Sequence, residues 1–249
     1  MLTNIKRFIK WNLFRFGYQI GKIPVGCQNK YKWLRELNIS SVVDIGANTG
    51  QFATEIKEWL PEVKIYSFEP IGDVYKQLLN NTSAFRNITA YNMALGAQNG
   101  TLDMQRNEFT AASSLLSLTD SAKETYAFAC KTVPEQIQIR TLDSMVANGQ
   151  VEIDSNSLIK IDVQGYESEV LKGGREAISL ANIIICEVCF IELYKGQAVF
   201  RDLVAQVEAL GFELRALWDI DMSGVDGFPI FGDAIFFRKN KVRLDSRSN

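Results

Sequence analysis

Two short apolar segments, residues 41–45 and 64–68, each run into residues that could bind a nucleotide-type cofactor. Glycines after the first segment let the backbone turn sharply and approach a ligand closely, which a Cβ atom would prevent. A carboxylate at the end of the second can accept hydrogen bonds from both ribose hydroxyls. A glycine turn alone could be purely structural, but the flanking acids favour a site for an adenosine-containing cofactor. The residues that carry this prediction are Asp44, Gly46, Asn48, Gly50 and Glu69.

Two further carboxylates are candidates for acid–base chemistry. Asp162 follows the apolar run 158–161 and Glu187 lies in the run 182–188, and ligands of open α/β sheets bind at the carboxyl ends of strands. Asp162 is the first candidate for a general base or a substrate-positioning group, and Glu187 is the second. Together they could also hold a divalent cation, although we assign no metal ligand. The structural alternative is that Asp162 pairs with Lys160 on the same strand face.

Other polar residues near these strand ends have two interpretations. Glu167 is expected to stabilise the start of the following helix, since acidic side chains favour that end of the helix dipole. Five more could contact a substrate or serve only as structural connections, and these are Tyr194, Lys195, Gln197, Trp218 and Asp219.

The composition excludes several kinds of site. The chain has 249 residues, a net charge of −2 and no histidine. Ser-His-Asp triads and histidine metal sites are therefore excluded, and any general base must be Asp, Glu, Lys, Tyr or water. The near-neutral charge argues against a nucleic-acid partner.

Cys186 and Cys189 fall in an apolar strand, so we expect buried free thiols, as in a reducing cytoplasm, and not a metal knuckle.

From residue 41 the hydrophobic pattern alternates between strands and helices, which is typical of a mostly parallel sheet with right-handed crossovers. The last two strands have no helix between them, which predicts an antiparallel hairpin at the sheet edge. The expected strands are residues 41–45, 64–69, 88–95, 158–162, 182–188, 213–218 and 233–238. The expected helices are residues 29–37, 49–60, 73–80, 167–180 and 200–210. Thr49 is expected to cap the second of these helices.

An insertion at about residues 97–140 interrupts this alternation. Short strands at 100–104 and 136–140 flank an irregular polar segment. Long insertions at the rim of an α/β sheet are often lids or substrate loops, and a structural hairpin is the alternative.

The chain divides into an N-terminal segment 1–38, a main domain 39–240 and a polar tail 241–249 that we expect to be disordered. Eight Lys or Arg and no acid occupy the first 35 residues, with apolar residues at helical spacing. This amphipathic helix could pack on the main domain, pack on a second copy in a homodimer, or bind an anionic membrane surface through residues 1–22. Charges interrupt every apolar stretch, so we expect a cytoplasmic protein with at most peripheral membrane contact.

Three blocks of sequence resemble the FkbM-type methyltransferases that depend on S-adenosylmethionine. The blocks are residues 44–50, 68–70 and 159–173, the last containing Asp162-Val163-Gln164-Gly165-Tyr166-Glu167. The resemblance covers roughly residues 40–238, and its third block is the most family-specific. It implies a class I methyltransferase (Rossmann-like) fold with a seven-stranded, mostly parallel sheet and an antiparallel last strand. It also implies a hydroxyl of a sugar, glycan or small metabolite as acceptor and S-adenosylhomocysteine as product.

The resemblance also implies roles for individual residues. Asp44 and Gly46 would lie by the amino acid moiety of the cofactor, Glu69 would hold the ribose diol, and Asp162 would border the cofactor. Asn92, Met93 and Ala94 would border the adenine. Many class I enzymes have an acidic residue there, so this chain must recognise adenine by stacking and backbone groups.

Two other functions are compatible with parts of this sequence. A nicotinamide-dependent dehydrogenase also uses a glycine turn, but its GxGxxG fingerprint differs from Gly46-Ala47-Asn48-Thr49-Gly50. A non-catalytic module could keep the cofactor fold for protein interaction or membrane tethering. The intact residues Asp44, Gly46, Gly50 and Glu69 argue against this alternative.

Overall fold

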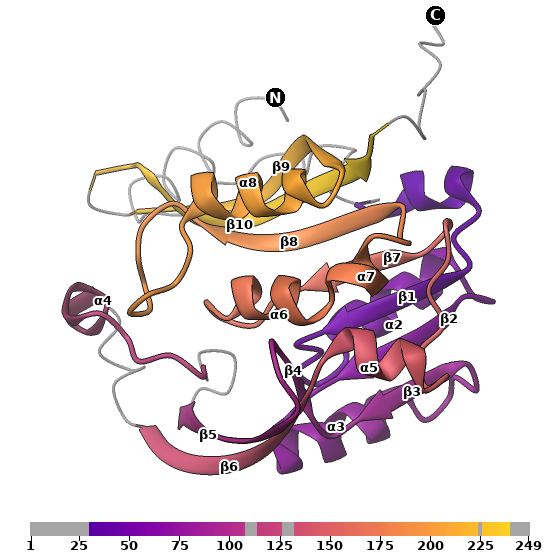
Figure 1. Cartoon of the computed structure of the whole chain (residues 1–249), viewed down its shortest axis with the longest axis horizontal. Helices are drawn as coiled ribbons and strands as arrows, with labels where there is room; N and C mark the ends of the chain where they lie inside the picture. The colour runs from indigo at the N-terminus through magenta and orange to yellow at the C-terminus, as the bar shows by residue number, and fades with distance from the viewer. Residues whose placement is uncertain (1–29, 108–113, 126–131, 224–225, 240–249) are drawn as a thin grey trace, which may run out of the picture.

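A seven-stranded sheet forms the centre of the protein (Figure 1). This computed structural model describes residues 30–107, 114–125, 132–223 and 226–239. The first five strands in the order are parallel, and β10 runs antiparallel to both of its neighbours. The expected α/β fold with an antiparallel last strand is therefore confirmed. In spatial order the strands are β3 (Ile88–Tyr91), β2 (Lys64–Phe68), β1 (Ser41–Ile45), β7 (Leu158–Ile161), β8 (Ile183–Cys189), β10 (Pro229–Arg238) and β9 (Phe212–Met222).

Helices cover both faces of this sheet and bury two hydrophobic clusters. On one face, α2 (Gln51–Trp59) and the 3₁₀ helix η2 (Lys32–Leu37) pack over residues such as Val42. The other face, which includes Val43, is covered by α5 (Leu142–Ala147), α6 (Glu167–Gly173), α7 (Arg175–Ile178) and α8 (Phe200–Ala209). Strand β1 is buried on both sides, so it lacks the alternation of a half-exposed strand, and its two polar residues, Ser41 and Asp44, are buried with its three apolar ones.

A second, three-stranded sheet is built from the insertion and from the chain that precedes it. Its strands are β4 (Ala94–Leu95), β6 (Thr132–Arg140) and β5 (Gly100–Asn107), in that order, and the last two form a long antiparallel pair. Gly173, the last residue of α6, lies directly against Gly96 after β4, where an added Cβ would come 1.8 Å from the Gly96 carbonyl oxygen. This backbone contact fixes the small sheet against the main domain.

Residues 114–119, within the insertion, lie against two loops of the main domain. The Ser114 hydroxyl donates to the carbonyl oxygen of Gln164 at 2.6 Å, and the Lys195 amide donates to the Ser117 carbonyl oxygen at 2.7 Å. Helix α4 (Asp120–Thr125) follows. The insertion therefore contains a hairpin pair of strands and a segment that lies against the loops after β7 and β8, while its use as a lid or substrate loop stays a prediction.

Three expected elements differ from the structure. The strand expected at 88–95 is split, because the Asn92 side chain donates to the carbonyl oxygens of Glu69 and Pro70 and the chain then leaves the main sheet. Thr49 does not cap α2; Gly50 occupies that position with φ +90° and no side-chain cap. The helix expected at 167–180 is broken into α6 and α7 at Gly174.

The other expected elements are present, but β6, β9 and β10 are each four residues longer at one end than expected. The helix expected at 29–37 is the 3₁₀ helix η2, and α5 was not predicted. Helix α3 (Gly72–Thr82) follows β2, and Gly211, with φ +92°, ends α8 as expected. Cys186 and Cys189 are buried free thiols. The predictions for the amphipathic helix in residues 1–29 and for the tail 241–249 fall outside the described residues. No helix in the described part of the chain is both long and apolar enough to span a membrane.

The Gly173 contact gives a test of the fold. Alanine is normally about 1 kcal/mol better than glycine inside a helix, but here its methyl group would overlap the Gly96 carbonyl. We expect Gly173→Ala to lower the free energy of unfolding by about 3 kcal/mol, measured by urea denaturation. Gly72→Ala is the control, because its Cβ would meet nothing closer than 4.0 Å. Equal stability of the two variants would contradict the packing described.

Candidate active site

A cavity of about 610 Å³ opens at the carboxyl ends of β1, β2, β7 and β8. This is the edge at which open α/β sheets bind ligands. One end, here called the glycine end, is lined by residues including Gly46, Ala47, Asn48, Glu69 and Ala94. The other, called the carboxylate end, is lined by residues including Lys160, Asp162, Gln164, Glu187 and Asp233.

Packing against neighbouring atoms, as well as access to a ligand, requires the glycines of the turn at residues 46–50. Gly46 has φ +86°, and an added Cβ would lie 1.8 Å from the carbonyl oxygen of Asp162 on the adjacent strand end. Gly46 and Asn48 line the cavity. Gly50 is not among the lining residues; its missing side chain makes room for Leu78 of α3. The structure therefore places Gly50 in helix packing and not at the cavity wall.

Glu69 is the residue immediately after β2. It is 6% exposed, and its carboxylate accepts hydrogen bonds from the backbone amides of Asn48 at 3.0 Å and Ile71 at 2.8 Å. Burial raises the pKa of Glu69 to about 7, against the lowering effect of these two amides. A carboxylate has about four acceptor positions, so Glu69 keeps the capacity to bind further hydroxyls.

The residues expected at the adenine are placed unequally. Ala94 lines the cavity, whereas Asn92 and Met93 are not among its lining residues. Asn92 ties the loop after β2 to the end of β3 through its amide, and Met93 packs against the hydrophobic cluster that includes Phe68. Asn92 therefore supports the loop that follows Glu69.

Asp44 is fully buried in β1 and is also absent from the cavity lining. Its Oδ2 accepts a 3.4 Å hydrogen bond from Ser67, while Oδ1 has no hydrogen-bond partner among the described residues. Burial raises the pKa of Asp44 to about 6, and the nearby Lys160 ammonium opposes this rise. Asp44 can thus influence the cavity through its electrostatic effect on Lys160, which lines it.

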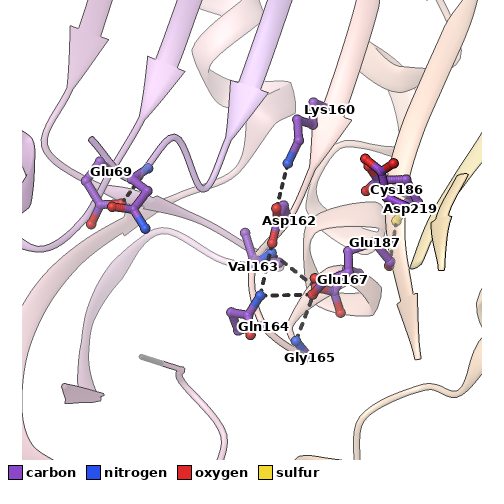
Figure 2. Close-up of polar contacts among 12 residues, drawn as sticks. Glu69, Lys160, Asp162, Val163, Gln164, Gly165, Glu167, Cys186, Glu187 and Asp219 are labelled. Carbon is purple, nitrogen blue, oxygen red and sulfur yellow. Dashed lines mark hydrogen bonds and ion pairs between the residues drawn. The ribbon is translucent and has the colours of Figure 1, made fainter. Parts of the chain in front are cut away.

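Lys160 and Asp162 form the ion pair that the sequence left as an alternative. The distance between Lys160 Nζ and Asp162 Oδ2 is 2.6 Å, and Figure 2 shows the two side chains pointing toward each other. Burial lowers the pKa of Lys160, but Asp162 and Asp44 more than offset this, so the amine stays protonated. Burial would raise the pKa of Asp162, and Lys160 instead holds it below its usual range. The ion pair therefore favours the ionised form of Asp162 and makes it a weaker base.

Gln164 connects the two candidate carboxylates. Its side-chain amide donates to Asp162 Oδ1 at 3.1 Å and to Glu187 Oε2 at 2.9 Å (Figure 2). Its amide oxygen accepts from the Tyr194 hydroxyl at 3.1 Å. Burial, with Asp162 close by, raises the pKa of Glu187 well above its ordinary value. The structure thus brings Asp162 and Glu187 together as two carboxylates of unequal basicity.

The role of Gln164 was missed from the sequence. It is one of four non-glycine residues of the described chain with positive φ, at 55°. Its position inside the most family-specific block, immediately before Gly165, was the one available signal.

Glu167 has the structural role that was expected. Its buried carboxylate accepts from the backbone amides of Val163 and Gly165, both at 3.1 Å, at the start of α6 (Figure 2). Burial raises the pKa of Glu167 to about 7, and these amides lower it. Glu167 therefore holds the loop that presents Gln164.

Of the remaining candidate residues, some lie at or beside the cavity wall and others lie away from it. Tyr194 lines the cavity, and Gln197 accepts from the backbone amides of Leu193 and Tyr194, each at 2.7 Å, which fixes that loop. Lys195 is exposed. Trp218 packs edge-on against Trp33, and Asp219 pairs with Lys30. Within the described ranges, no group of three or more His, Cys, Asp or Glu residues could hold a metal ion.

The sequence matches the model of the methyltransferase FkbM domain over residues 44–214. This match covers more than half of the chain, which therefore belongs to the FkbM methyltransferase family.

Several methyltransferases are similar to this chain. The 2-O-methyltransferase NoeI of Sinorhizobium fredii is 27% identical over 192 residues, which cover 75% of this chain and 76% of NoeI. The hexuronic acid methyltransferase AglP of Haloferax volcanii is 25% identical over 146 residues, 58% of this chain and 54% of AglP. The crystal structure of magnesium protoporphyrin IX methyltransferase (ChlM) from Synechocystis with bound S-adenosylmethionine aligns with a TM-score of 0.46 at 11% identity, over 95% of this chain and 96% of ChlM.

Removing the Lys160 ammonium should leave the buried carboxylate of Asp44 and the partly buried carboxylate of Asp162 without their shared cation. We expect Lys160→Met to lower the free energy of unfolding by about 3–5 kcal/mol at neutral pH. In the variant the pKa values of Asp162 and Asp44 rise, so the deficit should shrink as pH falls through those raised values and the carboxylates become neutral. Urea denaturation at neutral and acidic pH measures both effects.

The control for this variant is Lys172→Met, which removes an exposed lysine paired with Glu169. Exposed pairs contribute about 0–1 kcal/mol, so its effect should be small and nearly independent of pH. A Lys160→Met deficit no larger than that of the control would contradict the ion-pair interpretation.

Proposed function

We propose that the protein is an S-adenosylmethionine-dependent O-methyltransferase whose acceptor is a hydroxyl of a sugar, glycan or small metabolite. The observation that carries this proposal is one cavity with the glycine turn and Glu69 at one end and Asp162 and Glu187 at the other. Family membership supports methyl transfer. The relative named a 2-O-methyltransferase supports oxygen as the acceptor atom, and the relative named for hexuronic acid supports a sugar.

The residues of the glycine end fit the parts of this cofactor. Glu69 is placed to accept hydrogen bonds from the ribose hydroxyls while it remains fixed by two backbone amides. Ala94 offers an apolar wall for the adenine, with Asn92 and Met93 in supporting positions. The amino acid moiety is assigned to the turn at Gly46 and Asn48, with Asp44 contributing through Lys160. Asp162 would border the cofactor where the two ends of the cavity meet.

The carboxylate end supplies what a hydroxyl acceptor requires. The cofactor provides a methyl group bonded to a sulfonium, which is transferred by in-line displacement. Glu187 is the general base in this proposal, because it lines the cavity and burial raises its pKa, which makes its carboxylate a stronger base than that of Asp162. Asp162 stays ionised beside Lys160, so it orients the acceptor hydroxyl and does not remove its proton. We therefore favour Glu187 over Asp162 as the general base.

The ribose assignment can be tested by binding alone. We expect Glu69→Gln to weaken S-adenosylhomocysteine binding about 10- to 100-fold, since hydrogen bonds to a charged group contribute about 1.5–3 kcal/mol each. The same loss should appear for methylthioadenosine, which keeps the ribose but lacks the amino acid part. Calorimetric titration measures both ligands. Unchanged affinity in a folded variant would show that Glu69 does not bind the ribose.

The general-base assignment is tested by the pH profile of turnover. Once an acceptor is identified, we expect Glu187→Gln to lower kcat by about 10²- to 10⁴-fold. Its affinity for S-adenosylhomocysteine should stay within about twofold of the parent, because Glu187 lies at the carboxylate end. The rise of kcat with pH should disappear in Glu187→Gln and persist in Asp162→Asn. A profile that Glu187→Gln leaves unchanged would assign the proton to another group.

A further inference from the structure

Acidic side chains outnumber basic ones at the carboxylate end of the cavity. The lining there contains five carboxylates and two ammonium groups. The carboxylates are Glu55, Asp162, Glu187, Asp221 and Asp233, and the ammonium groups are Lys30 and Lys160.

Both ammonium groups are already paired with acids. Lys160 pairs with Asp162 at 2.6 Å, and Lys30 Nζ lies 3.1 Å from Asp233 Oδ2 and also contacts Asp219. Within the described residues, no ion pair involves the three other acids, Glu55, Glu187 and Asp221. Among the described residues, Glu55 and Asp221 therefore present carboxylates to an entering ligand without an ion-pair partner.

The four acids other than Asp162 lie at two depths in the cavity. Glu187 and Asp233 are register partners on β8 and β10, and both are partly buried. Glu55 on α2 and Asp221 on β9 are exposed at the rim. The deep pair can accept hydrogen bonds from ligand hydroxyls, whereas the rim pair acts on the charge of whatever enters.

Aromatic rings line the same end. Tyr31 and Phe52 meet edge-to-face with ring centroids 5.4 Å apart, and both line the cavity together with Phe231. Rings of this kind offer apolar faces for the C–H surface of a ligand, while carboxylates accept hydrogen bonds from its hydroxyl groups. This combination suits a ring-shaped polyhydroxyl molecule without negative charge.

We propose that this site selects an uncharged polyhydroxyl acceptor and rejects its carboxylate-bearing counterpart, through the acids Glu55 and Asp221 at the rim. This inference rests on the proposed function and deepens it by naming the charge class of the acceptor. An anionic acceptor would bring a like charge toward two acids that form no ion pair with a described lysine or arginine. The site therefore differs in specificity from a relative that is named for hexuronic acid.

A matched pair of sugars tests the proposal directly. Methyl glucopyranoside and methyl glucopyranosiduronate differ in one group, a CH₂OH in place of a carboxylate. Each is titrated onto the protein saturated with S-adenosylhomocysteine, and binding is followed by ligand-observed NMR. We expect the neutral sugar to bind at least about tenfold more tightly at about 0.01 M salt, and the ratio to fall at about 1 M salt, where charges are screened.

Two variants locate the selectivity, and a third is their control. Glu55→Gln and Asp221→Asn should each reduce the ratio about two- to threefold by improving binding of the anionic sugar. Glu58→Gln lies one turn further along α2, is exposed and does not line the cavity, so it should leave the ratio unchanged. A purely structural effect would change the binding of both sugars together and would not respond to salt.

Equal or tighter binding of the anionic sugar would overturn the proposal. So would failure of both sugars to bind a protein that still binds S-adenosylhomocysteine, and the proposed function would survive that result. Failure to bind S-adenosylhomocysteine itself would instead contradict the proposed function and remove the basis of this inference.

Discussion

The buried ammonium of Lys160 is the interaction on which the site depends. It lies on β7 between Asp44 of β1 and Asp162 at the end of its own strand, and the charge of each acid raises the pKa of the amine. A buried charge without a partner costs several kcal/mol, so we expect substitution of any one of these three residues to lower the free energy of unfolding. The same unit gives Asp162 a low pKa and leaves Glu187, one strand further, as the more basic carboxylate.

A backbone contact joins the two ends of the cavity. The carbonyl of Asp162 lies so close to Gly46 that no side chain fits between them, and the Asp162 amide donates to the Ile45 carbonyl oxygen at 3.0 Å. The turn that we assign to the cofactor and the strand end that we assign to the acceptor are therefore held rigidly together. Methyl transfer benefits from such rigidity, because alignment of the reacting groups can supply about 7–11 kcal/mol of the barrier in well-oriented systems.

Local patterns explain what the sequence could predict. The strand order along the chain, the glycine turn and the positions of Glu69, Asp162 and Glu187 follow from periodicity and from the rule that parallel strands share a carboxyl edge. Partners distant in sequence could not be predicted in this way. The packing of Gly50 against α3, the side-chain bonds by which Asn92 turns the chain out of the main sheet, and the bridge made by Gln164 all depend on tertiary contacts. The charge of the carboxylate end likewise emerges only when Glu55, Asp221 and Asp233 meet at one cavity.

The central claim is that this cavity binds S-adenosylmethionine and its product. The most direct measurement is calorimetric titration of the purified protein with S-adenosylhomocysteine, with NAD as the comparison and with EDTA present and absent. We expect saturable, EDTA-independent binding of S-adenosylhomocysteine at one site per chain and no binding of NAD. Folded protein that fails to bind S-adenosylhomocysteine, or that binds NAD instead, would contradict the account and favour a non-catalytic use of the fold.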